Sequence, residues 1–133
     1  MIIGTGIDLV DSRRIAKLMD SHELRFLEKY FTAHERDHIN KVSNTELRLL
    51  SIAKRFAAKE ACAKALGTGF REGITMSSIE IHNNALGKPS LSLNGDALDF
   101  VENMLAKGTN YHIHLSLTDE PPYAQAQVII ETL

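Results

Sequence analysis

The sequence has few of the features that mark secreted and membrane-spanning proteins. Cys62 is the single cysteine among 133 residues, so no disulfide can form within the chain. No run of 18 apolar residues is present. The apolar segment Met1–Val10 is too short to cross a membrane, and it lacks the basic residues that begin a secretory signal. These absences predict a cytoplasmic protein that does not enter a membrane.

Charge of either sign is not in large excess. The chain has 15 lysines and arginines against 17 acidic residues, a formal net charge of −2. This balance does not suggest a general attraction to nucleic acid, although local basic patches are possible. The 44% hydrophobic content is sufficient for a core, and the length suits one domain. We therefore expect a single domain over residues 1–133.

The periodicity of apolar residues predicts an α+β fold. Capping-box spacings begin helices at Thr32–Glu35 and Ser43–Glu46, and Gly67 is suited to end a central helix of about 20 residues. The order predicts a mostly antiparallel sheet packed against this long central helix. The other expected elements are strands at 1–10, 78–82, 90–93, 111–118 and 123–131, and helices at 12–19, from Ser21, and at 96–107.

Glu60 occupies an unusual position in the central helix. It belongs to an apolar stripe whose members recur at steps of four and three, namely Leu49, Ala53, Phe56, Glu60 and Ala63. Lys64 lies one turn later, so an exposed ion pair worth a few tenths of a kcal/mol is the ordinary explanation. Burying an unpaired carboxylate would cost several kcal/mol, which favours a compensating cation. Arg55 and Lys59 point to other sides, leaving Lys64 or a metal.

Asp8 supplies a second acidic group. In an alternating strand Asp8 shares a face with Gly4 and Gly6, and looks across space that the glycines leave empty. The opposite face carries Ile3, Thr5, Ile7 and Leu9. Asp11 has a simpler role as the cap of the next helix, from which Asp8 is separated by two residues. Two acids and a lysine near packed surface suggest a metal and a phosphate.

Several basic and histidine residues have ordinary explanations. The helix at 12–19 exposes a basic face that is solvated by default but could steer an acidic partner, formed by Arg13, Arg14 and Lys17. Three histidines without a nearby array of metal ligands are expected to be exposed polar residues, namely His22, His34 and His38. His114, taken alone, is a structural histidine on the polar face of its strand.

Five sequence features occur in one chain and in a fixed order. They are Gly4–Val10 (GTGIDLV), Arg55–Ala61 (RFAAKEA), Lys64, the Gly67–Gly69 turn and Leu86–Pro89 (LGKP). On these features, which span nearly the whole chain, the sequence closely resembles the 4′-phosphopantetheinyl transferases of the holo-acyl-carrier-protein synthase type. Gly-x-Gly alone would be weak, but the first motif followed by RFAAKEA is specific.

The resemblance implies transfer of the phosphopantetheine arm from coenzyme A to a serine of apo-acyl carrier protein, in fatty acid biosynthesis. Asp8 and Glu60 match the family's Mg²⁺ ligands, and Lys64 matches its active-site lysine, which makes these three the implied catalytic residues. The residues implied to bind coenzyme A are Arg55, Lys64, Gly67, Lys88, Pro89 and His114. The base for the serine proton stays open. A metal-bound water acted on by Glu60 or Asp8 is favoured, because no histidine–carboxylate dyad is apparent.

The resemblance also implies an assembly and a protein partner. Family members form trimers, in which Asp8 and the Glu60 helix are contributed by neighbouring subunits. The carrier protein binds helix one, the expected helix at 12–19, so an acidic helix of the carrier would face Arg14, together with Arg13 and Lys17. Asp119 departs from the family pattern, since many members carry histidine there, and the role of that histidine does not transfer. Neither nucleic acid nor a membrane is an expected partner.

Two other functions would use part of the same sequence. A non-catalytic coenzyme A or nucleotide-binding module would keep Arg55 and Lys64 but would not need Asp8 and Glu60 together. A structural interaction domain would bind an acidic protein through helix one and use the Glu60–Lys64 pair to stabilise an oligomer. The sequence does not predict which carrier proteins are accepted, or whether acylated coenzyme A is used.

Overall fold

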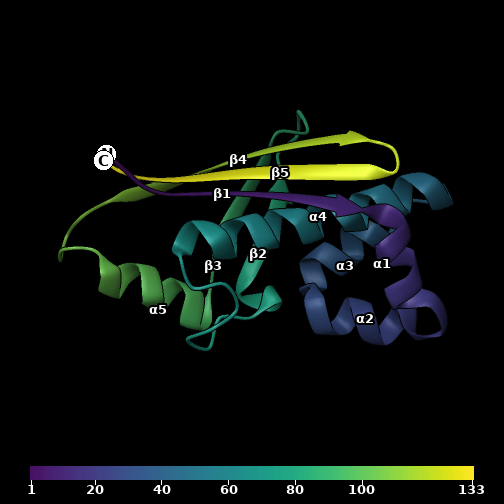
Figure 1. Ribbon diagram of the computed structural model, residues 1–133, viewed down its shortest axis with the longest axis horizontal. Coiled ribbons are helices and arrows are strands. Elements are labelled where there is room, and N and C mark those ends of the chain that lie inside the picture. Colours follow the sequence, from purple (N-terminus) through teal and green to yellow (C-terminus); the bar gives the residue numbers. More distant parts are fainter.

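The computed structural model describes residues 1–133 as two antiparallel sheets with the helices on one side of the larger one (Figure 1). The strands are β1 (Ile2–Asp11), β2 (Ile79–Asn83), β3 (Pro89–Leu93), β4 (Tyr111–Glu120) and β5 (Tyr123–Thr132). The helices are α1 (Ser12–Met19), α2 (Glu23–Tyr30), α3 (Ala33–Asn40), α4 (Thr45–Leu66) and α5 (Gly95–Met104). Two short 3₁₀ turns are η1 (Asp20–His22) and η2 (Met76–Ser78).

The larger sheet has the strand order β1-β5-β4, and β2 pairs with β3 in a separate hairpin. Every strand pair is antiparallel, which confirms the predicted α+β class and its antiparallel pairing. Helix α4 lies along one face of the larger sheet, while α1–α3 gather at one end of the molecule and α5 at the other (Figure 1). No helix is long and apolar enough to span a membrane.

Local capping signals fix most helix ends. The Thr32–Glu35 capping box makes both of its hydrogen bonds, and the Asp11 side chain accepts the Arg13 amide as predicted. Gly67 ends α4 in the left-handed conformation, at φ 81°. The start of α4 differs from the prediction by one residue, because Asn44 rather than Ser43 is the cap and accepts the Leu47 amide at 3.0 Å.

Two predicted helix boundaries are wrong by two and three residues. A helix expected from Ser21 begins instead at Glu23, because residues 20–22 form the η1 turn first. The helix expected to reach Lys107 ends at Met104, because Leu105 is extended. In β1 the register shifts between Ile2 and Gly4, and Ile3 packs against the core, unlike the exposed Thr5, Ile7 and Leu9 with which the predicted alternation groups it.

Helix α4 is buried around most of its circumference rather than along one stripe. Ala53, Ala57 and Ala61 have no exposed surface, and the sides assigned to Arg55 and Lys59 are buried as well. The many alanines let β1 and β5 lie close to the helix. Burial raises the pKa of the Cys62 thiol to about 12, which keeps it an inert core residue. The apolar periodicity of the sequence therefore predicted where the helix lies along the chain, but not which elements pack around it.

Candidate functional site

Two glycines of β1 set the position of Asp8. A Cβ atom on Gly4 would overlap the carbonyl oxygen of Ala65, and one on Gly6 would overlap that of Ala61. The space beside Asp8 is therefore not empty, as the sequence predicts, but filled by the backbone of α4. Two residues of a strand advance about 6.6 Å and four residues of a helix about 6 Å. This matched spacing places Asp8 beside the turn of α4 from Ala57 to Ala61, which contains Glu60.

Lys64 binds the Asp8 strand rather than Glu60. Its Nζ donates to Asp8 Oδ1 at 3.0 Å and to the carbonyl oxygen of Ile7 at 2.9 Å. The Glu60–Lys64 pair that the helical spacing predicts is not formed. The Asp8 side chain is 16% exposed and that of Lys64 is 52% exposed, so the ammonium lies at the rim of the cluster. Lys64 binds β1 instead of Glu60 because this strand offers it two acceptors at once, Asp8 Oδ1 and the carbonyl oxygen of Ile7.

Glu60 is half-buried beside the Asp8 carboxylate. Burial raises the pKa of Glu60, and the Asp8 charge raises it further, while Lys64 and Arg14 act in the opposite direction. The structure therefore brings Asp8 and Glu60 together within one chain. The resemblance instead implies that neighbouring subunits contribute Asp8 and the Glu60 helix to each cleft. Two acids with too little positive charge between them form a site that favours a cation.

This acid cluster suits a hard cation but does not complete its coordination. No group of three or more histidine, cysteine or acidic side chains is placed to hold a metal. Mg²⁺ prefers oxygen ligands and commonly keeps several waters beside one or two carboxylates and substrate phosphates. Asp8 and Glu60 fit that pattern, because they supply two carboxylates and leave the remaining positions to water and ligand oxygens.

Gly67 also lies at this end of α4. Its amide donates to the carbonyl oxygen of Lys64 at 3.0 Å, and its left-handed conformation turns the chain away from the helix. Arg55 is nine residues before Lys64, which places it about 13 Å back along the helix axis. The residues implied to bind coenzyme A therefore form two separate groups. Lys64 and Gly67 lie near Asp8 and Glu60, and the other residues lie around two cavities described next.

Arg55 forms the centre of a second group of residues. Its side chain donates to Ser51 Oγ at 2.5 Å and to Asn83 Oδ1 at 3.2 Å, whereas its buried Nε has no hydrogen-bond partner. Burial lowers the pKa of Arg55, against the effect of Glu35. A polar cavity beside this arginine is lined by residues of α3, α4 and the β2–β3 turn, among them His38, Lys54, Asn83, Asn84 and Gly87.

Lys88, Pro89 and His114 line the adjoining cavity, and Asn84 borders both cavities. His114 Nε2 lies 2.9 Å from Glu131 Oε1, and this hydrogen bond lowers the pKa of Glu131. The sequence predicts no histidine–carboxylate pair, so this is a correction. The cause is cross-strand geometry: β4 and β5 pair in register, which makes Glu131 a diagonal neighbour of His114.

His114 and Asp8 lie on opposite faces of the larger sheet. Asp8 pairs with Ala126, which is buried against α4, whereas His114 pairs with Ile129 on the face that no helix covers. Because successive strand residues alternate between faces, the two side chains point apart within one chain. The His114–Glu131 pair therefore does not serve the acid cluster of its own chain.

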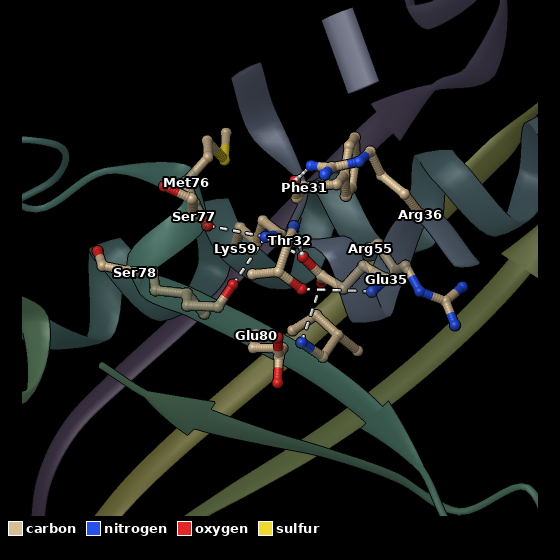
Figure 2. Close-up of polar contacts among 12 residues, drawn as sticks. Phe31, Thr32, Glu35, Arg36, Arg55, Lys59, Met76, Ser77, Ser78 and Glu80 are labelled. Carbon is tan, nitrogen blue, oxygen red and sulfur yellow. Dashed lines mark hydrogen bonds and ion pairs between the residues drawn. The ribbon is translucent and has the colours of Figure 1, made fainter. Parts of the chain in front are cut away.

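A buried ion pair was not found by sequence reasoning. Lys59 and Glu35 are both fully buried, and Lys59 Nζ lies 2.6 Å from Glu35 Oε1 (Figure 2). Burial lowers the pKa of Lys59, opposed chiefly by the Glu35 charge. The capping-box spacing identified Glu35 as a residue at the start of α3, but the sequence contains no signal for a partner 24 residues away.

Asp119 has a partner in this chain. Its carboxylate lies 3.0 Å from Lys54 Nζ, so β4 is linked to α4 at the edge of the Arg55 cavity. Both side chains are about one-third exposed. The acid at this position thus holds a lysine in place, which a histidine could not do in the same way.

The basic face of α1 is partly as predicted. Arg13 is not free, because its guanidinium binds Asp11 at 2.7 Å and this contact lowers the pKa of Asp11. Arg14 lies close enough to Glu60 to influence its charge. A shallow groove continues from α1 onto α2, lined by Leu18, His22, Arg25, Phe26, Lys29 and Tyr30.

The three histidines predicted to be exposed, His22, His34 and His38, are exposed.

Comparison with known proteins gives consistent matches. The model of a family described as the 4′-phosphopantetheinyl transferase superfamily matches residues 4–116. A holo-[acyl-carrier-protein] synthase of Brucella ovis is 47% identical over 133 residues, covering 100% of this chain and 97% of the relative.

Solved structures match over similar lengths. The holo-[acyl-carrier-protein] synthase from Neisseria meningitidis has a TM-score of 0.83 and 35% identity, covering 98% of this chain and 99% of that chain. A holo-(acyl-carrier-protein) synthase from Bacillus anthracis in complex with CoA (3′,5′-ADP) has a TM-score of 0.81 and 32% identity, covering 100% and 99%. The similarity thus includes both groups of residues described above.

Proposed function

Because the chain belongs to the 4′-phosphopantetheinyl transferase superfamily, we infer that it is an enzyme that transfers 4′-phosphopantetheine from coenzyme A to a serine of apo-acyl carrier protein. The serine oxygen forms a bond to the phosphorus that carries the pantetheine arm. The bond from this phosphorus to the bridging oxygen breaks, and adenosine 3′,5′-bisphosphate leaves. The observation that carries this function is the meeting of Asp8, Glu60 and Lys64 at one end of α4.

Asp8 and Glu60 are proposed to hold Mg²⁺. Burial and the nearby Asp8 charge raise the pKa of Glu60, and carboxylate oxygens are donors that this cation prefers. When bound, Mg²⁺ would neutralise and orient the pyrophosphate of coenzyme A. The repulsion between the two acids would then be relieved, which makes their proximity favourable in the loaded enzyme.

Lys64 is the proposed phosphate-binding cation. In the structure its ammonium is shared between Asp8 and the carbonyl oxygen of Ile7, and its side chain is half-exposed. A long, exposed lysine can turn from Asp8 to a phosphate oxygen without disturbing the core. In that position it would stabilise the charge that develops on the departing bisphosphate.

A trimer would bring the two groups of residues to one coenzyme A. Within a single chain, Arg55, Lys88, Pro89 and His114 lie apart from the acids, and His114 is on the opposite sheet face. We propose that one subunit contributes Asp8, Glu60, Lys64 and Gly67, and that its neighbour contributes the other four residues. The uncovered outer face of β1, with Ile7 54% and Leu9 63% exposed, is a suitable surface for such contacts.

The acyl carrier protein is proposed to bind along α1. Arg14 and Lys17 are available there, and Arg13 could exchange its Asp11 contact for an acidic side chain of the carrier. Arg25 and Lys29 extend the positive surface onto α2 beside Leu18. Complementary charge of this kind mainly raises the association rate and selects the partner. Arg14 also lies near Glu60, so a carrier bound there would have its serine close to the acids.

We further propose that residues 1–133 form one transferase domain that acts in the cytoplasm and serves fatty acid biosynthesis.

Release of adenosine 3′,5′-bisphosphate tests the proposed reaction. Purified protein, apo-acyl carrier protein, coenzyme A and Mg²⁺ should produce the bisphosphate in equal amount to the carrier consumed, as measured by liquid chromatography. Binding of coenzyme A without release would instead indicate a non-catalytic module, and omission of the carrier is the matched control.

A further inference from the structure

We propose that the buried Lys59–Glu35 pair is a positioning element for coenzyme A binding, because it holds β2 and the following turn in register with Arg55 on α4. The proposal rests on the proposed function, since it takes the turn with Lys88 and Pro89 as part of the coenzyme A site. Lys59 and Glu35 are positioning residues in this account and do not touch the coenzyme themselves.

Lys59 makes every hydrogen bond that its ammonium group can donate. Nζ donates to Glu35 Oε1 at 2.6 Å, to the carbonyl oxygen of Met76 at 2.7 Å and to that of Ile79 at 2.7 Å. Three donors thus meet three acceptors in a fully buried site (Figure 2). A charge held in this way has one favourable position, because any shift leaves a buried donor unpaired.

Glu35 binds the same strand with its other oxygen. Oε2 accepts the Ile81 amide at 3.0 Å, while Oε1 also accepts the Thr32 amide at 2.9 Å. The pair therefore binds β2 at Ile79 and Ile81, two residues apart along one edge of the strand. The other edge of β2 pairs with β3, which is its only strand partner. The ion pair takes the place of a neighbouring strand and fixes where β2 lies along α4.

The strand continues directly into the turn that faces Arg55. Asn83 follows Ile81 by two residues, and its side chain accepts from Arg55 Nη2 at 3.2 Å and donates to the carbonyl oxygen of Gly87 at 3.1 Å. Asn84 Oδ1 then accepts the Lys88 amide at 2.9 Å. A displacement of β2 would pass through these bonds to the residues proposed to bind coenzyme A.

The spacing on α4 matches the spacing on β2. Arg55 precedes Lys59 by one turn, about 6 Å along the helix, and Asn83 follows Ile81 by about 6.6 Å along the strand. Two contacts at matched spacing determine the register of strand against helix, which a single contact would not do. This is the same relation by which Gly4 and Gly6 position Asp8 on another side of α4.

Stability alone does not account for the pair. Replacing a buried ion pair by apolar residues of similar size is often neutral or stabilising, whereas removing one partner is strongly destabilising. A variant that neutralises both partners therefore separates positioning from stability. Glu35→Gln together with Lys59→Met keeps the length of both side chains and leaves no unpaired buried charge.

The test compares this double variant with the unchanged protein in steady-state kinetics. We expect the KM for coenzyme A to rise at least tenfold while kcat falls by less than threefold. The KM for acyl carrier protein should stay within twofold, because α1 is not attached to the pair. Ile130→Val is the matched control for a general loss of stability, since Ile130 is fully buried in β5. A KM for coenzyme A that is unchanged in the double variant would overturn the proposal.

Hydrogen exchange supplies a second measurement that does not depend on activity. In the double variant, or in Glu35→Asp if the double variant does not fold, the Ile81 and Lys88 amides should exchange at least tenfold faster, because aspartate keeps the charge but shortens its reach to the strand. The amides shared by β1 and β5 should keep their protection. Equal acceleration in both sheets would show that the pair acts on global stability only. Failure of the proposed function is distinguishable, because the unchanged protein would then release no bisphosphate.

Discussion

At the scale of single residues, Glu60 differs from an ordinary surface glutamate because its neighbours do not compensate its charge. Lys64, the partner that helical spacing predicts, is bound to Asp8 and Ile7 instead. Burial and the Asp8 charge raise the pKa of Glu60. A carboxyl whose pKa is raised in the folded state favours folding in its protonated form. In the absence of metal, this contribution should be lost as the pH rises from the usual carboxyl pKa through the raised one.

Glu60→Gln should therefore have opposite effects on stability and on activity. Without divalent cations at neutral pH, the melting temperature should rise by a few degrees, because a half-buried carboxylate is removed. Transfer should fall by at least about 100-fold, since one of two proposed cation ligands is lost. Calorimetric melting with and without Mg²⁺ is the measurement, and Mg²⁺ should raise the melting temperature of the unchanged protein only. Near-normal turnover of the variant at saturating Mg²⁺ would exclude the ligand role.

At the scale of secondary-structure elements, the contact between β1 and α4 positions the site. Gly4 and Gly6 allow the strand to lie directly on the carbonyl oxygens of Ala65 and Ala61. The distance between the two elements is consequently set by backbone atoms, which cannot move aside as a flexible side chain can. Asp8 follows on the same face of β1, so the distance between the strand and the helix also sets its distance from Glu60.

Gly6→Ala should move the strand away from the helix. The added methyl overlaps the Ala61 carbonyl oxygen, and overpacking of this kind typically costs about 1–3 kcal/mol. Transfer activity should fall by more than the loss of stability explains, because Asp8 shifts with the strand. Urea unfolding and kcat at a temperature well below melting measure the two effects. Asp99→Ala, at an exposed position of α5 outside the site and the proposed contact surfaces, is the control and should change neither. Full activity in Gly6→Ala would contradict this account of the site.

Sequence reasoning predicted the elements better than their contacts. Caps such as Asp11, Thr32 and Gly67 were found because they are local, and their hydrogen bonds reach only a few residues. Alternation in β1 identified the face that carries Asp8, but it could not say that α4 fills the space beside the glycines. The Lys59–Glu35 pair stayed hidden for the same reason, since it depends on how α3, α4 and β2 pack.

At the scale of the whole molecule, the outer face of the larger sheet is left uncovered in one chain. Ile7 and Leu9 are exposed there, on the same sheet face as the polar residues of β4, with β5 between the two strands. Leu9→Asp should prevent assembly in the proposed trimer, because a charge would replace an apolar contact. Sedimentation should give the mass of three chains for the unchanged protein and a smaller species for the variant. A monomer that is fully active would refute the shared site.

The positive surface of α1 and α2 also belongs to this scale, because it concerns a second protein. Arg14→Glu should raise the KM for acyl carrier protein about tenfold and make it less sensitive to salt, since long-range attraction is weakened. The KM for coenzyme A should change much less. Rates measured over a range of NaCl concentrations supply the comparison, with Lys41→Glu as the control for an exposed lysine outside this surface. An unchanged KM and salt dependence would leave α1 merely solvated.

We propose that this chain attaches phosphopantetheine to a carrier serine with the help of Asp8, Glu60 and Lys64. The most direct measurement is the intact mass of apo-acyl carrier protein after incubation with coenzyme A, Mg²⁺ and the purified protein. We expect the carrier to gain the mass of one phosphopantetheine arm on a serine, and to gain none with Glu60→Gln over the same time. A carrier whose mass stays unchanged with the unaltered protein, or that gains the arm equally well with Glu60→Gln, would contradict the proposal.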